Sequence, residues 1–208
     1  MALLLSASLL GSCGSLLGGD ERADLFRFGV ADLTAVPRAQ GALPGHSVSF
    51  LRPRFPQEIE GDRILTTRGE RALYVKDARW VAPVPELFTQ ALVRQFASRS
   101  PDVRLTDAKS ATKASHALQV VIERFEANYA VDGGGKTPPT VIIEGDATFF
   151  DLTDRHAVAS SRFSVQEPAS TNTTSGIVAA FDRAVARYTE QLTDWSLGTQ
   201  QKHAGAGI

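Results

Sequence analysis

Alternating apolar and polar residues in the middle of the chain limit its possible folds more than any other feature of the sequence. Between Ala117 and Val131, apolar side chains fall at every second position, and the parity of the pattern changes near Arg124. A period of two is typical of a strand buried on one face, and the change of parity predicts a β-bulge. Residues 140–152 and 158–165 repeat the pattern after short turns. We therefore expect three long strands that form an antiparallel meander.

Two other segments have the period of amphipathic helices. In residues 81–100 and again in residues 175–197, apolar side chains recur every three or four positions, which gives each segment one apolar face. The first face consists of Leu87, Phe88, Ala91, Leu92 and Phe96, and the second of Ile177, Val178, Phe181, Val185, Tyr188, Leu192 and Trp195. Ser175 is well placed to cap the second helix, because its hydroxyl can accept a hydrogen bond from a free backbone N–H.

Shorter strands precede and follow the first helix. Alternation predicts strands at 24–29, 47–51 and 103–106, and a hairpin that joins 63–67 to 72–75, while glycines and prolines predict a loop at 31–46. The order is therefore four strands, a helix, four strands and a helix, which predicts an α+β fold. We expect a mainly antiparallel sheet with the two amphipathic helices packed on one face, as a two-layer sandwich.

The charge balance and the cysteine count exclude two classes of protein. The chain has 22 Lys and Arg against 23 Asp and Glu, a formal net charge of -1. Proteins that bind nucleic acid need a local excess of cations for phosphate contacts, so we expect no nucleic-acid partner. The single cysteine, Cys13, allows no disulfide within the chain, which excludes a disulfide-stapled scaffold.

The N-terminal residues are typical of an exported and anchored protein. Residues 2–12 form an apolar stretch about as long as the core of a secretory signal peptide, and shorter than the roughly 20 residues that cross a bilayer. The stretch ends in Leu10-Gly11-Ser12-Cys13, which is similar to a bacterial lipobox: an apolar residue and two small residues before a cysteine. A lipid on Cys13, with two or three acyl chains, would anchor the mature chain stably.

This pattern predicts four parts of the chain. We expect a signal peptide at 1–12, a lipidated tether at 13–23, one folded domain at 24–198 and a flexible tail at 199–208. Gly14 follows the cysteine where an Asp would retain a lipoprotein in the inner membrane, so the outer membrane is favoured. The alternative is a core helix or a disordered leader in which Cys13 is incidental.

The sequence offers no arrangement of residues that is typical of catalysis or metal binding. The four histidines are His46, His116, His156 and His203, and none has a partner at metal-ligand spacing. The run Gly133-Gly134-Gly135-Lys136 lacks the Ser or Thr of a phosphate loop and lies between two strands, so a hairpin turn is the better interpretation. The hydroxyls of Ser160, Ser161 and 170–175 lie in no nucleophile motif. We expect no catalytic residue, no metal and no cofactor, and hence no enzyme.

The dipeptide Arg79-Trp80 is the most distinctive feature of the folded part. It precedes a helix start flanked by Pro83 and Pro85. A Trp in this position can act as a hydrophobic staple that fixes the entry of the chain into the helix. The functional alternative is a contact with a ligand or a partner protein.

These features together resemble a known family, the ABC-type transport auxiliary lipoproteins that accompany MCE-domain lipid transporters. The resemblance rests on Asp62-Arg-Ile-Leu, Leu73-Tyr-Val, Arg79-Trp80, Pro83-Val-Pro, Leu87-Phe88 and Val120 to Glu126, with the lipobox and the last helix in addition. It covers most of residues 24–197 and brings no catalytic residues, so Cys13 is the only functional site that carries over.

The resemblance implies a location and a set of partners. Such proteins lie in the periplasm, usually lipid-anchored at the inner leaflet of the outer membrane. They act with an MCE-domain substrate-binding protein, an ABC permease and an ATPase, and move phospholipids or other lipophiles between the two membranes. A homo-oligomer is left open. The main alternative is an outer-membrane assembly or envelope-structure lipoprotein without a transport role, and a periplasmic hydrolase and a lipid-binding carrier are two others.

Overall fold

The computed structural model describes residues 23–30, 46–100, 102–107, 114–133 and 136–205. Its elements are β1 (Asp24–Phe26), β2 (His46–Phe50), η1 (Gln57–Ile59), β3 (Arg63–Arg68), β4 (Arg71–Trp80), α1 (Val84–Arg99), β5 (Val103–Asp107), β6 (His116–Asn128), η2 (Val131–Gly133), β7 (Thr140–Asp151), β8 (His156–Pro168) and α2 (Thr174–Gly205). The predicted order of strands and helices is confirmed, and all eight strands belong to one sheet. Most of the predicted loop at 31–46, and the whole lipobox, lie outside the described residues.

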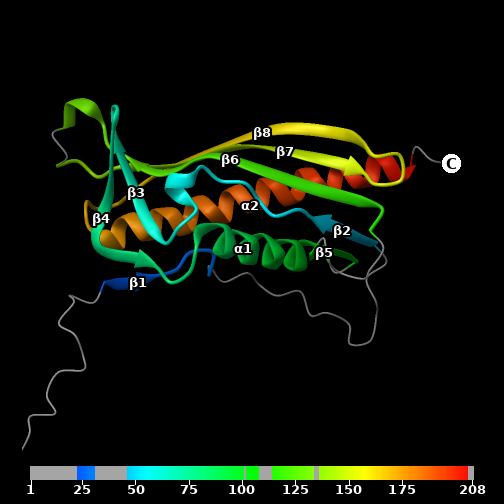
Figure 1. Cartoon of the computed structure of the whole chain (residues 1–208), viewed down its shortest axis with the longest axis horizontal. Helices are drawn as coiled ribbons and strands as arrows, with labels where there is room; N and C mark the ends of the chain where they lie inside the picture. The colour runs from blue at the N-terminus through cyan, green and yellow to red at the C-terminus, as the bar shows by residue number, and fades with distance from the viewer. Residues whose placement is uncertain (1–22, 31–45, 101, 108–113, 134–135, 206–208) are drawn as a thin grey trace, which may run out of the picture.

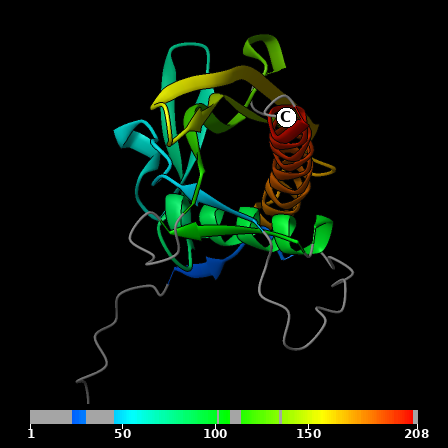
Figure 2. The same ribbon diagram turned by 90° about the vertical axis from the view of Figure 1, so that its right-hand side faces the viewer.

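The sheet curls around the two helices. Seen along the long axis, it has the shape of a C, and α1 and α2 lie on its concave side (Figure 2). Helix α2 runs beneath the long strands β6, β7 and β8 and packs against α1 (Figure 1). The α+β class with two helices is therefore as predicted. Within the described residues, no helix combines the length and the apolar composition needed to span a bilayer.

The expectation of a mainly antiparallel sheet was wrong. Four of the seven strand pairings are parallel: β1 with β4, β2 with β5, β2 with β6 and β3 with β6. The antiparallel pairs, β3 with β4 and the predicted meander of β6, β7 and β8, join strands that are consecutive in the chain. The parallel pairs join strands that are distant in sequence, and parallel neighbours require a crossover between them. Alternation within one strand carries no information about such a crossover.

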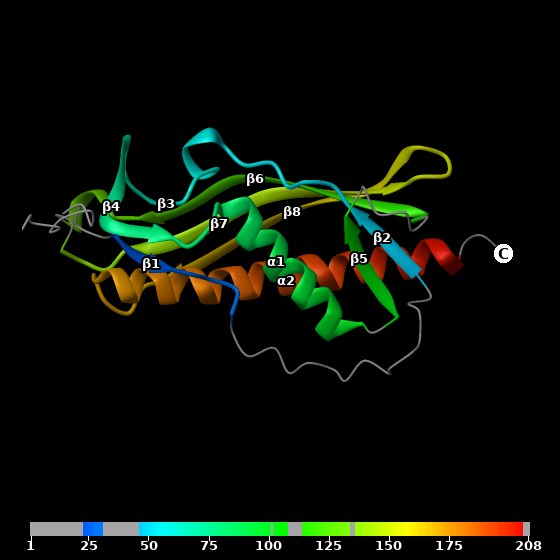
Figure 3. The ribbon, with the colours of Figure 1, turned by 60° about the horizontal axis from the view of Figure 1, so that its bottom comes forward.

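The sheet divides into two branches at β6. The first residues of β6 pair with β2 through His116–Leu118, whereas its last residues pair with β3 through Ala127–Asn128. Strand β5 then extends the first branch, and β4 and β1 extend the second. Figure 3 shows the two branches at opposite ends of α1. The chain that connects β2 to β3 crosses the gap between the branches, where Arg54 bridges to Val121 of β6.

Helix α2 is longer than its sequence pattern predicts. It begins at Thr174 and continues to Gly205, beyond the expected end near Leu197. Thr199 and Gln200 are only 8% exposed, so residues predicted to start a flexible tail are helical and packed. The capping residue is Thr173 rather than Ser175, because the Thr173 hydroxyl accepts a hydrogen bond from the Gly176 N–H at 3.2 Å. Tertiary packing stabilises this helix where its apolar stripe has ended.

The predicted bulge in β6 is confirmed and depends on a glycine in the next strand. The register of β6 against β7 shifts between Ile122 and Arg124, so Glu123 is the extra residue. Gly145 of β7 lies opposite this point. A Cβ atom on Gly145 would come within 2.3 Å of the Val121 carbonyl oxygen and 2.9 Å of the Ile122 Cα. The two backbones can approach this closely only where a side chain is absent.

We therefore expect Gly145→Ala to lower the free energy of unfolding by about 1–3 kcal/mol, the usual cost of overpacking. Urea unfolding of purified protein, followed by tryptophan fluorescence, measures the change. Gly198→Ala is the matched control, because its Cβ would meet no atom within 4 Å and the residue lies inside α2. The control should gain up to about 1 kcal/mol from helix propensity. Equal unfolding midpoints for Gly145→Ala and the native chain would contradict the steric argument.

Candidate functional site

The three residues that the sequence singled out lie in very different places. Cys13, the predicted lipid-attachment site, lies outside the described residues. Arg79 and Trp80 are the last two residues of β4. Because successive side chains of a strand point to opposite faces, one of these two side chains enters the core and the other is exposed.

Trp80 is a core residue. Its side chain is 1% exposed, and its ring packs edge-on against Phe28 and Phe181 at centroid distances of 4.9 and 5.3 Å. Its backbone N–H also donates to the Asp62 carbonyl at 2.6 Å. A ring in this position offers no surface to a partner of the folded chain. These contacts connect the N-terminal segment, the end of β4 and α2, which is a structural role.

Arg79 lies on the outer surface. Its guanidinium donates to the Asp62 carboxylate at 3.1 Å, and about half of each side chain is exposed. Beside it, Leu25 and Val81 are among the exposed large apolar residues, with exposed fractions of 64% and 50%. Leu25 pairs with Arg79 between β1 and β4. The functional alternative for the dipeptide therefore concerns Arg79 alone.

The segment after β1 is held by both helices. The Gly29 N–H donates to the Asp182 carboxylate of α2 at 2.6 Å, and the Arg94 guanidinium of α1 donates to the Gly29 carbonyl at 2.6 Å. Gly29 has a φ of 70°, and a Cβ there would lie 2.5 Å from the Ala91 Cβ. Only glycine fits both this backbone conformation and this approach to α1. The start of the folded domain is thus fixed to its two helices.

Side-chain hydrogen bonds join the two helices near the C-terminal end of α1. Arg99 donates to the Asp194 carboxylate at 2.7 and 2.8 Å and to Glu190 at 3.0 Å. The hydrogen bond from Arg99 lowers the pKa of Asp194 below its usual range.

On the convex face of the sheet, Arg162 of β8 pairs with Glu123 of β6 and Asp146 of β7. These exposed pairs make a polar outer face, as expected for a sheet that is buried on one side.

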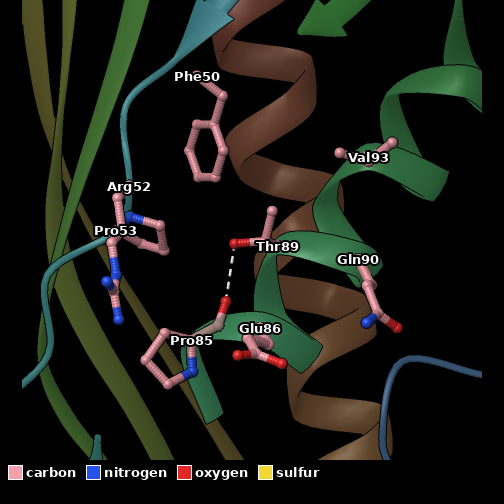
Figure 4. Close-up of a pocket in the computed structure, with 8 residues that line it drawn as sticks. All are labelled: Phe50, Arg52, Pro53, Pro85, Glu86, Thr89, Gln90 and Val93. Carbon is pink, nitrogen blue, oxygen red and sulfur yellow. Dashed lines mark hydrogen bonds between the residues drawn. The ribbon is translucent and has the colours of Figure 1, made fainter. Parts of the chain in front are cut away.

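The candidate site is a groove of about 530 Å³ between α1 and the chain that connects β2 to β3. We call it the α1 groove. Its lining comes from Phe50, Arg52 and Pro53 on one side and from Pro85, Glu86, Thr89, Gln90 and Val93 of α1 on the other. Figure 4 shows the two walls facing each other, with α2 behind them. The volume lies in the range of small-molecule sites in proteins.

The α1 groove combines an apolar lining with unpaired charges at its rim. Phe50, Pro53 and Pro85 are buried and form the apolar lining. Arg52 and Glu86 are exposed, and among the described residues neither forms an ion pair or a side-chain hydrogen bond. The Thr89 hydroxyl is already engaged, since it donates to the Pro85 carbonyl at 2.7 Å. The groove can therefore bind a ligand through two opposite charges and an apolar contact.

Sequence reasoning missed the α1 groove. Its two walls lie more than 30 positions apart, and its residue types form no motif. No group of three or more potential metal ligands occurs among the residues that the structure describes. The side chains of the groove can make charged and apolar contacts with a ligand.

The comparisons with known proteins agree with the fold. The sequence model of the ABC-type transport auxiliary lipoprotein component matches residues 31–193, so the chain belongs to this family. The resemblance stated from the sequence is thereby confirmed. The family name implies an association with an ABC transporter and a membrane-anchored location in the cell envelope. No curated protein matches the sequence.

Two solved structures are similar over most of the chain. A DUF330-family protein from Xanthomonas campestris is 26% identical, with a TM-score of 0.67 over 79% of this chain and 92% of its own. An uncharacterized protein of known crystal structure is 14% identical, with a TM-score of 0.61 over 75% of this chain and 95% of its own. The second likeness concerns the fold alone.

The different positions of Arg79 and Trp80 predict different effects of truncation. Trp80→Ala should lower the free energy of unfolding by about 3–5 kcal/mol, because it removes a large buried ring. Arg79→Ala should change it by less than about 1 kcal/mol, since an exposed ion pair contributes little. Urea unfolding followed by circular dichroism measures both. A Trp80→Ala protein as stable as the native chain would refute the assignment of this ring to the core.

Proposed function

We propose that this chain is a lipid-anchored periplasmic accessory component of an ABC transporter that moves phospholipids or other lipophiles between the inner and outer membranes. The observation that carries the proposal is the family match over residues 31–193. The lipobox-like sequence that ends at Cys13 lies upstream of this match and supports it independently. In this proposal the partners are an MCE-domain substrate-binding protein, a permease and an ATPase.

The proposed role is one of binding and not of catalysis. The family is named for an auxiliary part in transport, and the side chains that converge in the α1 groove are suited to binding. An anchored domain raises its own local concentration beside the membrane, so even a weak contact with the transporter would be well populated. A tether of residues 13–23 spans at most about 40 Å when fully extended, which limits the domain to a layer close to its membrane. We assign the anchor to the inner leaflet of the outer membrane.

Purification of the intact chain from detergent-solubilised envelopes tests the proposal. We expect mass spectrometry to find a diacylated Cys13 at the N-terminus, and an MCE-domain protein with its permease and ATPase in the same complex. Cys13→Ser is the matched control, because it removes the acceptor thiol and leaves the folded domain unchanged. The control protein should leave the membrane fraction and lose most of the transporter subunits.

Two other results would contradict the proposal in different ways. An acylated chain that elutes only with outer-membrane assembly factors would favour the assembly or envelope-structure role instead. An unmodified chain that stays out of the membrane fraction and brings no transporter subunit would refute both the anchor and the accessory role.

A further inference from the structure

The α1 groove lies where the sheet lacks a strand. Strand β5 covers the outer edge of β2, and β4 covers the outer edge of β3. The connecting residues 51–54 fill the space between these two branches and run alongside β6, to which they are hydrogen-bonded. Among the described residues, no strand pairs with their outer side. The groove occupies this gap, and α1 closes its far side (Figure 4).

The connecting residues include an unpaired backbone donor and acceptor beside the groove. The N–H groups of Leu51 and Arg54 donate to β6, each at 3.0 Å, which holds the segment extended against the sheet. Arg52 lies between them, in a segment that departs from regular strand alternation, since Leu51 and Arg54 are three positions apart and both bond to β6. Among the described residues, the backbone N–H and C=O of Arg52 have no hydrogen-bond partner. They form a donor and an acceptor at an open sheet edge, the feature that strand addition requires.

The opposite wall has the length of a short peptide. The groove-lining residues of α1 run from Pro85 to Val93, eight helical steps or about 12 Å. An extended chain covers that distance in about four residues. Val93 is 40% exposed, one of the few exposed large apolar side chains of the described chain. A peptide laid between the two walls would cover it.

The charges at the rim indicate which peptide would fit. Arg52 and Glu86 lie on opposite walls, and neither is paired with the other or with any described residue. Two opposite charges in one groove favour a segment that carries an acidic and a basic side chain. The apolar lining of Phe50, Pro53 and Pro85 favours an apolar side chain between them. A lipid acyl chain could use this lining but would leave the Arg52 backbone groups unpaired.

We propose that the α1 groove binds an extended segment of a partner polypeptide. The segment adds to the open edge at Arg52, places an apolar side chain against Phe50 and Pro85, and directs an acidic side chain to Arg52 and a basic one to Glu86. That the segment belongs to a transporter subunit rests on the proposed function. Peptide binding by the groove does not rest on it, so each hypothesis can be refuted without the other.

Selection from a phage-displayed library of random heptapeptides tests the proposal on the full chain purified in detergent. The most enriched peptide is synthesised with a fluorescent label, and its Kd is measured by fluorescence anisotropy. Arg52→Glu and Glu86→Lys should each weaken binding about tenfold, and both residues are exposed, so the variants should fold. Lys136→Glu is the charge control, because this exposed lysine lies in the loop between β6 and β7, far from the groove in sequence and in the sheet. It should leave Kd unchanged.

Two further measurements distinguish strand addition from a contact between charges alone. The double variant Arg52→Glu/Glu86→Lys should recover binding to a peptide whose acidic and basic residues are exchanged. Methylation of the backbone nitrogen that pairs with Arg52 should weaken binding about tenfold or more, whereas methylation of the neighbouring nitrogen should not. Hydrogen exchange of the Arg52 amide should slow when the peptide is bound.

Three outcomes would overturn the proposal. In the first outcome, none of the peptides enriched by the selection depends on Arg52 and Glu86 for binding. Backbone methylation could leave Kd unchanged at every position, which would exclude strand addition. Alternatively, vesicles of phosphatidylethanolamine could bind in an Arg52- and Glu86-dependent way while no peptide does, which would make the groove a headgroup site. None of these results depends on recovery of a transporter.

Discussion

Four aromatic rings in a closed cycle determine how the layers of this domain meet. Phe28 packs against Trp80 and Phe125, and Phe181 packs against the same two rings, with centroid distances between 4.9 and 5.3 Å. The rings come from the segment after β1, the end of β4, the bulged half of β6 and helix α2. Aromatic pairs of this kind contribute about 0.5–1.5 kcal/mol each beyond the area they bury. The cycle therefore fixes the second branch of the sheet to α2, and the position of α1 and its groove depends on that attachment.

Local patterns in the sequence predicted the elements well, and the pairings between distant strands poorly. The period of two in residues 117–131 indicated both β6 and its bulge, because alternation directly reflects which side chains are buried. The parallel pairing of β2 with β5 could not be predicted in this way, since β3, β4 and α1 lie between the two strands in the chain. The end of α2 was also missed, because Thr199 and Gln200 are polar residues that only the assembled fold buries.

The candidate site was harder to predict than the fold, for a related reason. Arg79-Trp80 attracted attention as an unusual dipeptide, yet the core accounts for the tryptophan. Cys13 could be predicted as a lipid-attachment site because a lipobox-like pattern is contiguous in the sequence, and it stays a prediction. The α1 groove has no contiguous signal, since it exists only where the connection after β2 meets the exposed face of α1. The prolines at 53 and 85 are the one hint that the sequence offers, because each ends or begins an element at the groove.

The hydrogen bond between Gly29 and Asp182 has a consequence for the order in which the domain can form. The two residues are 153 positions apart, and Phe28 finds its neighbours only in later parts of the chain. Synthesis proceeds from the N-terminus, so β1 is made long before α2. Phe28 and the Gly29 backbone therefore have no partners until nearly the whole domain has been made. The last helix closes the structure on its first strand, and the chain can complete its fold only when its synthesis is almost finished.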